Sequence, residues 1–321
     1  MASTVLILGG AGRIGHALAH AFVDAGWHVL AQARRPLPAT LAARPRLHWV
    51  QCDALDAAAV NAAAQGADVV IHALNPPYTE WDRLALPLLD AAIAAARTSH
   101  ALLMLPGNVY NFGREMPTLL TPATPEHGDT AKARIRIEAE ARMAAGTDFD
   151  SVVIRAGDFF GGVQPGSWFD LALASKLEAG RFIYPGPTDI AHAWAYLPDL
   201  ARAFVGVAEQ RVRLGGHHRL HFAGHTASGD EMRSALEAAV GRPLRNGTLP
   251  WGLMHLGSPF VPMWRELVAM RYLWQRPHRL DEAALVALIG PVRQTPLQQA
   301  VSAALADTGP LRKRGPRVAP I

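Results

Sequence analysis

The sequence has a single cysteine, Cys52, among its 321 residues, so no disulfide can form within the chain. It has no uninterrupted apolar run near the roughly 18 residues that a membrane-spanning helix needs. The N-terminus lacks the charged segment and cleavage site of a secretory signal peptide. We therefore expect a cytoplasmic protein in a reducing compartment, without a membrane partner.

Excess charge of one sign is also absent from most of the chain. The formal net charge is +4, and the last twelve residues contain four basic side chains and no acid. Without these four, 27 of the 31 basic residues remain, which equals the 27 acidic ones. A neutral body with a basic tail at 311–321 does not predict a nucleic-acid partner.

Hydrophobic residues make up 50% of the chain, enough for a sizeable core. Six short apolar runs in the first 155 residues are typical of buried strands. They are Thr4–Leu8, His28–Ala33, Leu47–Gln51, Val69–His72, Ala101–Leu105 and Ser151–Arg155. Helical patterns lie between them near 13–25, 55–65, 80–97 and 130–145. This alternation predicts an α/β fold, a Rossmann-type doubly wound parallel sheet.

The pattern changes after Arg155, where Gly and Pro become dense between 157 and 187, as in loops. Further helices are expected near 167–179, 198–209, 229–240, 263–275, 281–289 and 296–306. Ser228 followed by Glu231 has the spacing of a helix capping box. We interpret 1–155 as the Rossmann domain and 156–310 as a smaller C-terminal substrate domain, interleaved with the first.

A glycine motif follows the first expected strand. Gly9, Gly12 and Gly15 form Gly-x-x-Gly-x-x-Gly where a strand passes into a helix. The first glycine permits a tight turn, the second lets the backbone approach a pyrophosphate, and the third lets helix and strand pack closely. The helix N-terminus, with Arg13 and Ile14, then stabilises phosphate charge. This context predicts dinucleotide binding.

The end of the second strand indicates which nicotinamide coenzyme is bound. A carboxylate there favours NAD(H), because it binds the ribose 2′-hydroxyl. This chain has Ala33, Arg34 and Arg35 instead. Two arginines, with Arg13 in the glycine loop, suit a 2′-phosphate, so we expect NADP(H) to be preferred over NAD(H). The alternative is that Arg34 and Arg35 simply begin a solvated loop.

Two further segments are candidates for the coenzyme site. Asp53, followed by Ala54, comes after the third strand, where an acid can accept a hydrogen bond from the adenine amino group. Its alternative role is to cap the next helix. Small residues after the fourth strand let the backbone line a coenzyme; this segment is Ala73, Leu74 and Asn75.

Together these residues resemble the extended short-chain dehydrogenase/reductase superfamily, the NAD(P)-dependent epimerase/dehydratase group. The resemblance covers most of the chain. The matching segments, in the family's order, are Gly9–Gly15, Asp53, Val70–Ala73, Asn108–Tyr110, Arg155–Gly161 and Tyr196–Ala201. It implies a small-molecule substrate and a homodimer built by the helices near 80–97 and 130–145. It also implies coenzyme contacts from Pro106, Arg155 and Ala156, and substrate contacts from Tyr78, Asn108, Asp158 and Phe159.

The catalytic pattern departs from the family. Its Ser or Thr four residues before Tyr110 is Pro106 here. The family's Tyr-x-x-x-Lys, in which tyrosine is the acid/base and lysine binds the ribose, becomes Gly128 followed by Lys132. Lys132 is one of only three lysines in an arginine-rich chain. We predict that it binds the nicotinamide ribose, against the alternative of a solvated helix charge.

The missing hydroxyl leaves the proton donor open. Tyr110 is the first candidate, because it follows the strand that ends near the expected nicotinamide. The other candidates are Tyr78, Tyr196, Asp158 and His127. Each of these side chains has the alternative of an ordinary packed or exposed residue.

Two other chemistries receive little support. The four histidines between His217 and His225 have no nearby cysteine and no His-Glu-x-x-His pattern, so no metal site is expected. A Gly-x-Ser-x-Gly elbow is absent, which disfavours hydrolase chemistry.

Two hypotheses follow. The first is an NAD(P)-dependent oxidoreductase or epimerase acting on a small carbonyl or sugar-like substrate, with Lys132 and Tyr110 as catalytic residues. The second is a catalytically inactive NADP(H)-binding sensor or scaffold protein that has kept the fold.

Overall fold

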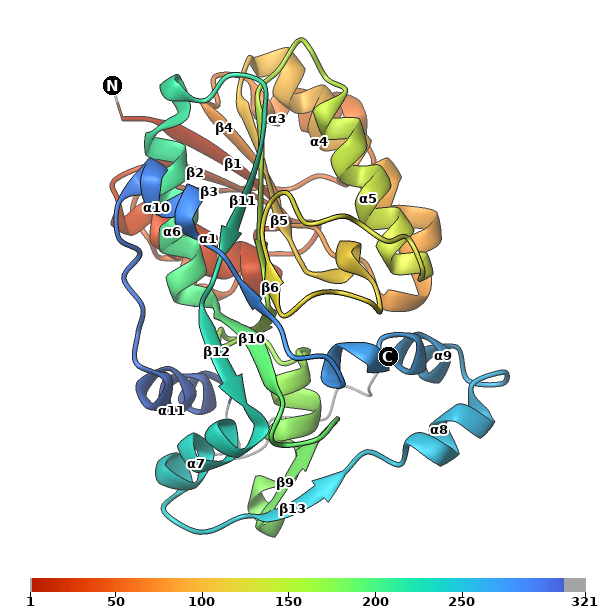
Figure 1. The fold of residues 1–321 in the computed structure, drawn as a ribbon. Helices are drawn as coiled ribbons and strands as arrows, with labels where there is room; N and C mark the ends of the chain where they lie inside the picture. The colour runs from red at the N-terminus through yellow and green to blue at the C-terminus, as the bar shows by residue number, and fades with distance from the viewer. Residues whose placement is uncertain (1, 309–321) are drawn as a thin grey trace.

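The computed structural model describes residues 2–308, and its centre is a seven-stranded parallel sheet (Figure 1). The strand order is β11-β7-β5-β4-β1-β2-β3. These strands are β1 (Thr4–Leu8), β2 (His28–Gln32), β3 (Leu47–Val50), β4 (Val69–His72), β5 (Leu102–Gly107), β7 (Ser151–Ala156) and β11 (His217–Phe222). The order reverses direction beside β1, where doubly wound sheets bind their ligands.

Helices cover both faces of this sheet (Figure 1). One face carries α1 (Arg13–Asp24), α6 (Leu197–Glu209) and α10 (Ala283–Ile289); the other carries α3 (Ala57–Ala64), α4 (Trp81–Ser99) and α5 (Ala131–Ala144). Successive residues of β1 point to opposite faces: Val5 and Ile7 pack with the first group, and Leu6 and Leu8 with the second. Both faces of the strand are therefore buried, which explains its uninterrupted apolar sequence.

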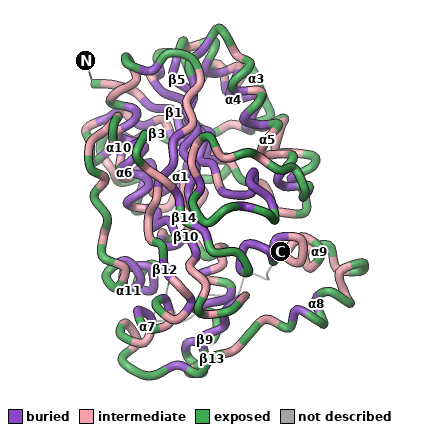
Figure 2. The backbone as a smooth tube through the Cα atoms, viewed as in Figure 1, coloured by how far each residue is buried: buried purple, intermediate pink, exposed green. Residues whose placement is uncertain are grey.

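A smaller mixed unit lies beyond the C-terminal edge of the sheet (Figure 1). Its strands are β8 (Asp158–Phe160), β9 (Arg181–Tyr184), β10 (Ala191–Tyr196), β12 (His225–Ser228) and β13 (Arg245–Thr248), with a short pair formed by β6 (Leu119–Leu120) and β14 (Arg279–Leu280). Its helices are α7 (Gly229–Val240), α8 (Trp251–Gly257), α9 (Pro262–Ala269) and α11 (Leu297–Thr308). A second core of aromatic side chains, including Trp194, Trp274 and Phe160, holds this unit together. Buried residues continue from the large sheet into the smaller unit (Figure 2).

The predicted α/β class and all six predicted strands are confirmed. Residues after 155 return to the large sheet as β11, and α6 and α10 pack on its face. The capping box at Ser228 and Glu231 is present. The division at residue 155 stays a prediction, and the basic tail 311–321 lies outside the described residues.

Two predicted helices were wrong in detail. The segment 167–179 forms a π-helical turn at Phe169–Leu173 and a 3-10 turn at Leu177–Ala179. The Asp170 carboxylate accepts hydrogen bonds from the backbone of Gly166 and Ser167, which favours a tight local turn over a regular helix. The segment 263–275 is interrupted: α9 ends at Ala269, and a 3-10 turn follows at Arg271–Trp274.

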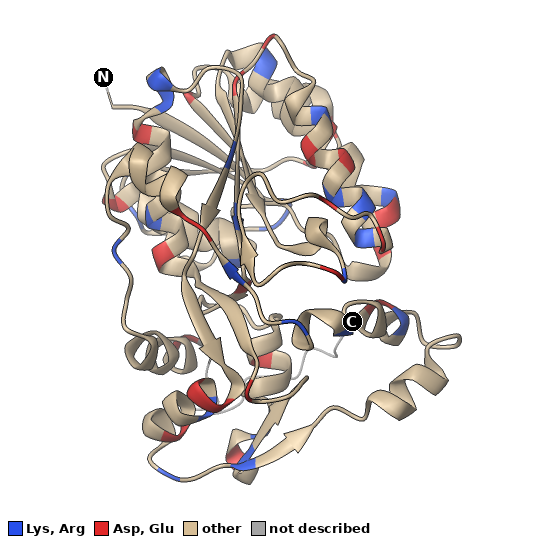
Figure 3. Ribbon diagram, in the orientation of Figure 1, with Lys and Arg blue, Asp and Glu red and all other residues tan. Residues whose placement is uncertain are grey.

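Charged residues lie mainly on the outer helices and loops (Figure 3). Among residues 2–308, the buried ones are Lys132, Glu140, Arg155 and Asp199. None of the described helices is long and apolar enough to cross a membrane. Buried charge is costly unless it is paired or used, and three of these residues, Lys132, Glu140 and Arg155, lie on α5 and β7.

Candidate coenzyme and substrate site

The glycine loop joins β1 to α1 and has the shape that a pyrophosphate needs. Gly9 has a φ of +85°, which favours glycine. A Cβ atom at Gly15 would lie 2.1 Å from the Gly9 carbonyl oxygen, so only glycine allows the helix to begin there. A Cβ atom at Gly12 would meet only that same oxygen, at 3.1 Å. Packing within the protein therefore explains the glycine at position 12 less well than it explains Gly15. A ligand that approaches the Gly12 backbone is consistent with this difference.

A residue that the sequence reasoning missed fixes this loop. Gln32, at the end of β2, is buried, and its Oε1 atom accepts a hydrogen bond from the Gly9 amide at 3.0 Å. Its Nε2 atom donates to the Cys52 carbonyl at 2.7 Å. The side chain thus connects the glycine loop to the end of β3. A polar residue inside an otherwise apolar strand was the available signal.

The three predicted arginines are placed differently. Arg34 and Arg35 are exposed directly after β2, and the part of the chain described gives neither a carboxylate partner. Arg13, at the start of α1, donates to the Gly161 carbonyl at 2.9 Å and forms an ion pair with Asp170. Arg13 therefore ties the glycine loop to the C-terminal unit, and its guanidinium is already engaged.

Asp53 lies exposed in the loop after β3, and its Oδ1 atom accepts a hydrogen bond from the Leu55 amide. The alternative that it caps the next helix is wrong, because Asp56 caps α3 by accepting from the Ala59 amide. Ala54 is buried beside it. The Asp53 carboxylate remains available at the strand end where adenine is expected.

The end of β4 lies against the glycine loop. A Cβ atom on Gly9 would come within 3.1 Å of the Ala73 carbonyl and the Leu74 side chain. Asn75 follows on the exposed side. The structure therefore brings the two segments predicted to line the coenzyme into direct contact.

Two tyrosines meet at the C-terminal end of the sheet. The hydroxyl oxygens of Tyr78 and Tyr110 share a hydrogen bond at 2.6 Å. The Asn108 side chain fixes the turn by accepting from the Tyr110 amide at 3.0 Å. Burial raises the pKa of Tyr78 to about 12 and holds the pKa of Tyr110 well above its ordinary value. Both phenols are therefore protonated at neutral pH and can act as hydrogen-bond or proton donors.

Lys132 adjoins this pair, and the alternative of a solvated helix charge is wrong, since its side chain is only 3% exposed. Its Nζ atom lies 4.5 Å from the centre of the Tyr78 ring and donates to the Tyr78 carbonyl at 3.1 Å. It also lies 2.5 Å from a carboxylate oxygen of Glu266 on α9. No sequence pattern indicated Glu266, because its pairing with Lys132 depends on how the C-terminal unit folds back.

The position of Gly128 needs a structural correction. Thr130 caps α5 with its side chain, so the helix begins at Ala131 and Gly128 lies before it. Residues 128 and 132 therefore do not share a helix face. The basic residues four apart at the start of this helix are Lys132 and Arg136.

Pro106 and Arg155 lie on neighbouring strands, β5 and β7, and both are buried. Arg155 is held by Glu140 of α5 at 2.5 Å and by Glu126. Although burial opposes its charge, these two carboxylates keep the pKa of Arg155 above its ordinary value. Its Nε and Nη2 atoms are committed to these carboxylates, whereas its Nη1 atom is buried without a hydrogen-bond partner among the described residues.

The predicted substrate residues after β7 lie at the junction of the two units. The Asp158 carboxylate on β8 accepts a hydrogen bond from the Nε2 atom of His192 on β10, at 2.8 Å. Phe159 lies on β8, is half-buried and packs against the core of the large sheet. Tyr196 is buried at the end of β10, and burial raises its pKa to about 12. His127 is exposed before α5, and its backbone amide donates to the Asn111 carbonyl at 2.7 Å.

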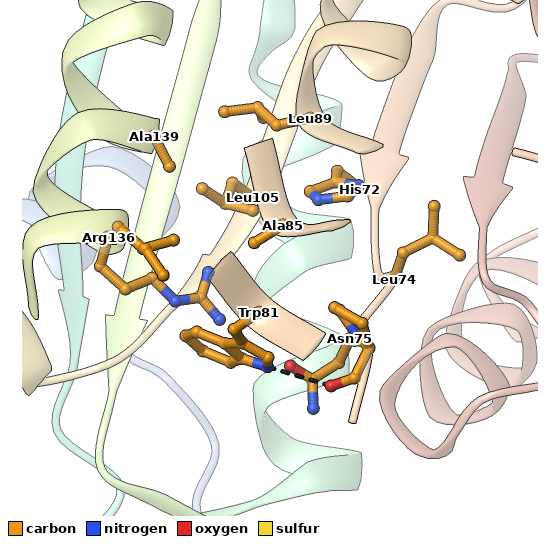
Figure 4. Close-up of a pocket in the computed structure, with 11 residues that line it drawn as sticks. His72, Leu74, Asn75, Trp81, Ala85, Leu89, Leu105, Arg136 and Ala139 are labelled. Atoms are coloured by element: carbon orange, nitrogen blue, oxygen red, sulfur yellow. Dashed lines mark hydrogen bonds between the residues drawn. The ribbon is translucent and has the colours of Figure 1, made fainter. Parts of the chain in front are cut away.

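A small pocket opens between β4, α4 and α5 (Figure 4). His72 and Arg136 supply its ionisable groups. Burial, followed by the nearby Arg136 charge, lowers the pKa of His72 to about 3, so its imidazole is neutral. The sequence reasoning missed this pocket; the four-residue spacing from Lys132 to Arg136 was its only local signal.

The four histidines at 217–225 form ordinary contacts. His217 hydrogen-bonds Ser151 at 2.8 Å, and His221 contacts the Leu120 carbonyl at 3.1 Å. Within residues 2–308, no three His, Cys, Asp or Glu side chains are arranged to hold a metal ion.

Comparison with known proteins agrees with this geometry. Residues 9–161 match the family model described as NAD(P)H-binding. No curated protein sequence matches the chain. Its fold is similar to that of UDP-glucose 4-epimerase from Bifidobacterium longum, in complex with NAD+ and UDP, at 17% identity and a TM-score of 0.75, over 94% of this chain and 97% of that one.

A second similar structure is UDP-glucuronic acid 4-epimerase from Bacillus cereus, in complex with UDP-glucuronic acid and NAD. Its identity is 17% and its TM-score 0.74, over 95% of this chain and 98% of that one. Likeness at this identity establishes the fold. Together with the NAD(P)H-binding match, it confirms a pyridine-nucleotide-binding Rossmann fold.

Proposed function

We propose that the chain is a member of the extended short-chain dehydrogenase/reductase superfamily and acts as an NADP(H)-dependent oxidoreductase or epimerase on a small carbonyl or sugar-like substrate; the NAD(P)H-binding match and the shared fold support this. The observation that carries the proposal is the Tyr78–Tyr110 hydroxyl pair beside Lys132. This pair supplies the proton that the family's missing tyrosine would otherwise supply.

The coenzyme is held by the glycine loop. Gly12 leaves its backbone open to the pyrophosphate, and the N-terminus of α1 stabilises the charge. Exposed Arg34 and Arg35 supply cationic donors for a 2′-phosphate at the end of β2, which supports NADP(H) over NAD(H). When bound, the nicotinamide supplies or accepts the hydride.

The tyrosine pair handles the proton. Burial raises the pKa of Tyr78 to about 12 and holds the pKa of Tyr110 well above its ordinary value, so each phenol keeps its proton at neutral pH. Tyr110 donates this proton to the substrate oxygen as hydride reaches the carbonyl carbon, and Tyr78 donates its own proton to Tyr110 through their 2.6 Å hydrogen bond. The nearby Lys132 ammonium stabilises the resulting phenolate. The high pKa values favour reduction of a carbonyl over oxidation of an alcohol.

Turnover of a carbonyl panel tests this function, followed through NADPH absorbance. We expect Tyr110→Phe to lower kcat by about 100-fold with coenzyme affinity unchanged, because one proton donor is lost. Tyr184→Phe is the matched control, since Tyr184 is equally buried but lies on β9. Full activity of the Tyr110→Phe protein on a compound that wild type reduces would contradict the assignment.

The sensor or scaffold remains a second candidate, and one observation favours it. Lys132 is closed off by Glu266 and by the Tyr78 carbonyl instead of projecting free toward a ribose. If no compound turns over, and NADPH binding changes the protein's association with another cellular protein, the sensor function replaces the enzyme. A homodimer through α4 and α5 is part of the proposal in either case, and sedimentation tests it.

A further inference from the structure

Arg136 projects from α5 into the pocket between α4 and β4 and lies over the ring of Trp81, 4.8 Å from its centre (Figure 4). Among residues 2–308, no carboxylate forms an ion pair with it. Its Nε atom is buried and has no hydrogen-bond partner. By contrast, its neighbours on the helix are committed: Lys132 pairs with Glu266, and Glu140 pairs with Arg155.

The pocket offers a second unpartnered donor. His72 is 7% exposed, and its Nδ1 atom is buried without a partner. The neutral imidazole carries one N–H, and with that hydrogen on Nδ1 it can donate one hydrogen bond. The lining contains no Asp or Glu, and its other walls are mostly apolar, including Leu89, Leu105 and Ile135. The pocket lining therefore brings a cationic fork and a neutral donor together without a carboxylate of its own, and the nearby Glu140 charge acts on Arg136 from outside that lining.

We infer that this pocket binds a carboxylate of the substrate. A guanidinium fork matches a planar carboxylate with two parallel hydrogen bonds. The single positive charge balances a monoanion, whereas a phosphate dianion would leave charge uncompensated between apolar walls. The Trp81 ring lies against one side of the guanidinium. The indole Nε1 atom of Trp81 donates to the Pro76 carbonyl at 3.0 Å, which fixes the position of the ring.

The pocket and the tyrosine pair belong to one site. The Trp81 ring lies 5.6 Å from the Tyr78 ring and 6.3 Å from the Tyr110 ring, measured between centres. The substrate class that fits both features is a carbonyl compound bearing a carboxylate, an oxo acid, in which Arg136 binds the acid and Tyr110 faces the carbonyl. This substrate class rests on the function proposed above, whereas carboxylate binding by itself does not.

Binding is tested first, without any reaction. Propionate and propionamide have nearly the same shape and differ in charge, and ligand-observed NMR measures both on the full-length protein. We expect wild type to bind propionate at least about tenfold more tightly than propionamide. Equal affinities, or tighter binding of inorganic phosphate, would overturn the inference; this comparison needs no variant to fold.

Variants locate the site. Arg136→Met keeps the stem over Trp81 and is expected to remove the preference for propionate. Arg134→Met is the matched control, since Arg134 is exposed on the same helix and donates only to the Gly128 carbonyl. Retained preference in Arg136→Met would place the anion elsewhere. Displacement of propionate by NADP+ would assign Arg136 to the coenzyme and would equally overturn the inference.

Turnover then separates this inference from the proposed function. A series of oxo acids and the matching oxo amides is offered with NADPH. We expect the acids alone to be reduced efficiently, and Arg136→Met to raise their KM more than it lowers kcat. Equal reduction of the amides would overturn the substrate class and leave the reductase intact. Propionate binding without reduction of any compound would retain the pocket and overturn the enzymatic function.

Discussion

The Lys132 ammonium lies 2.5 Å from the Glu266 carboxylate, although 134 positions separate the two residues. The pair connects α5 of the large sheet to α9 of the C-terminal unit, directly above the Tyr78 ring. Lys132 is buried and Glu266 is mostly buried, so the contact joins the two units at the proposed reaction site.

Loss of this pair is expected to destabilise the protein. Glu266→Gln leaves the buried ammonium without a carboxylate, which should cost about 1–3 kcal/mol of unfolding free energy. Glu178→Gln, at an exposed residue, should change it by less than about 0.5 kcal/mol. Urea unfolding measures both. Equal stability of the two variants would show that the contact contributes little.

Lys132→Met tests the ribose role of the lysine. We expect it to weaken NADPH binding and to reduce turnover, because both the ribose contact and the charge beside Tyr78 are lost. Fluorescence titration with NADPH measures the affinity. A variant that folds and binds NADPH as tightly as wild type would restrict Lys132 to a structural role with Glu266.

Coenzyme preference depends on the exposed arginines after β2. We expect NADPH to bind more tightly than NADH, and Arg34→Ala to weaken NADPH binding alone, by about 1.5–3 kcal/mol for a lost charge-assisted contact. Titration of both coenzymes against wild type and variant measures this. Equal affinities in wild type would contradict the prediction.

Two glycines of the loop should respond differently to substitution. Gly12→Val should abolish binding of either coenzyme with little change in the melting curve, because a Cβ atom at this position meets only the Gly9 carbonyl oxygen, at 3.1 Å. Gly15→Val should unfold or strongly destabilise the protein, because its Cβ atom would lie 2.1 Å from the Gly9 carbonyl. Coenzyme binding by a folded Gly12→Val protein would reduce the loop to a structural turn.

Acid is expected to destabilise the fold through buried neutral histidines. Burial lowers the pKa values of five histidines to about 3 or 4: His16, His72, His217, His221 and His278. Below about pH 6.5 the unfolded chain binds protons that the folded protein does not. Their stabilising contribution is therefore complete above about pH 6.5 and is lost progressively as the pH falls toward the folded pKa values.

Urea unfolding at pH 7.5 and 5.5 measures this effect. The same unfolding experiments are repeated in 0.5 M salt, where the Debye length is about 4–5 Å. This salt weakens exposed ion pairs and leaves the contribution of the buried histidines. Unchanged stability between the two pH values would contradict the buried neutral state of these histidines.

The sequence predicted the large sheet well because its signals are local. Buried strands such as Thr4–Leu8 are apolar runs bounded by turn residues, and the cap at Ser228 needs only Glu231. The glycine loop was also readable, since its spacing and its place after a strand are both in the sequence. Its partner Gln32 was missed, because one amide in a strand does not indicate what it bonds.

The catalytic region was harder to predict because its contacts are long-range. Tyr78 and Tyr110 were each candidates, yet nothing in the sequence indicated that their hydroxyls meet. Lys132 was chosen for its rarity, while Glu266 lies in a helix of the C-terminal unit. Arg136 was passed over because an arginine on an exposed-looking helix is ordinarily solvated, and only the packing of Trp81 across α4 and α5 removes that solvation.

A crystal structure with NADP+ bound tests the central claim most directly, because it shows which side chain faces C4 of the nicotinamide. The account predicts that the substrate space above C4 is bordered by the Tyr110 hydroxyl, still within hydrogen-bond distance of Tyr78. A carbonyl placed there would have its reacting atoms about 3–3.5 Å from both donors. A nicotinamide that faces away from Tyr110, with no proton-donating side chain near C4, would contradict it.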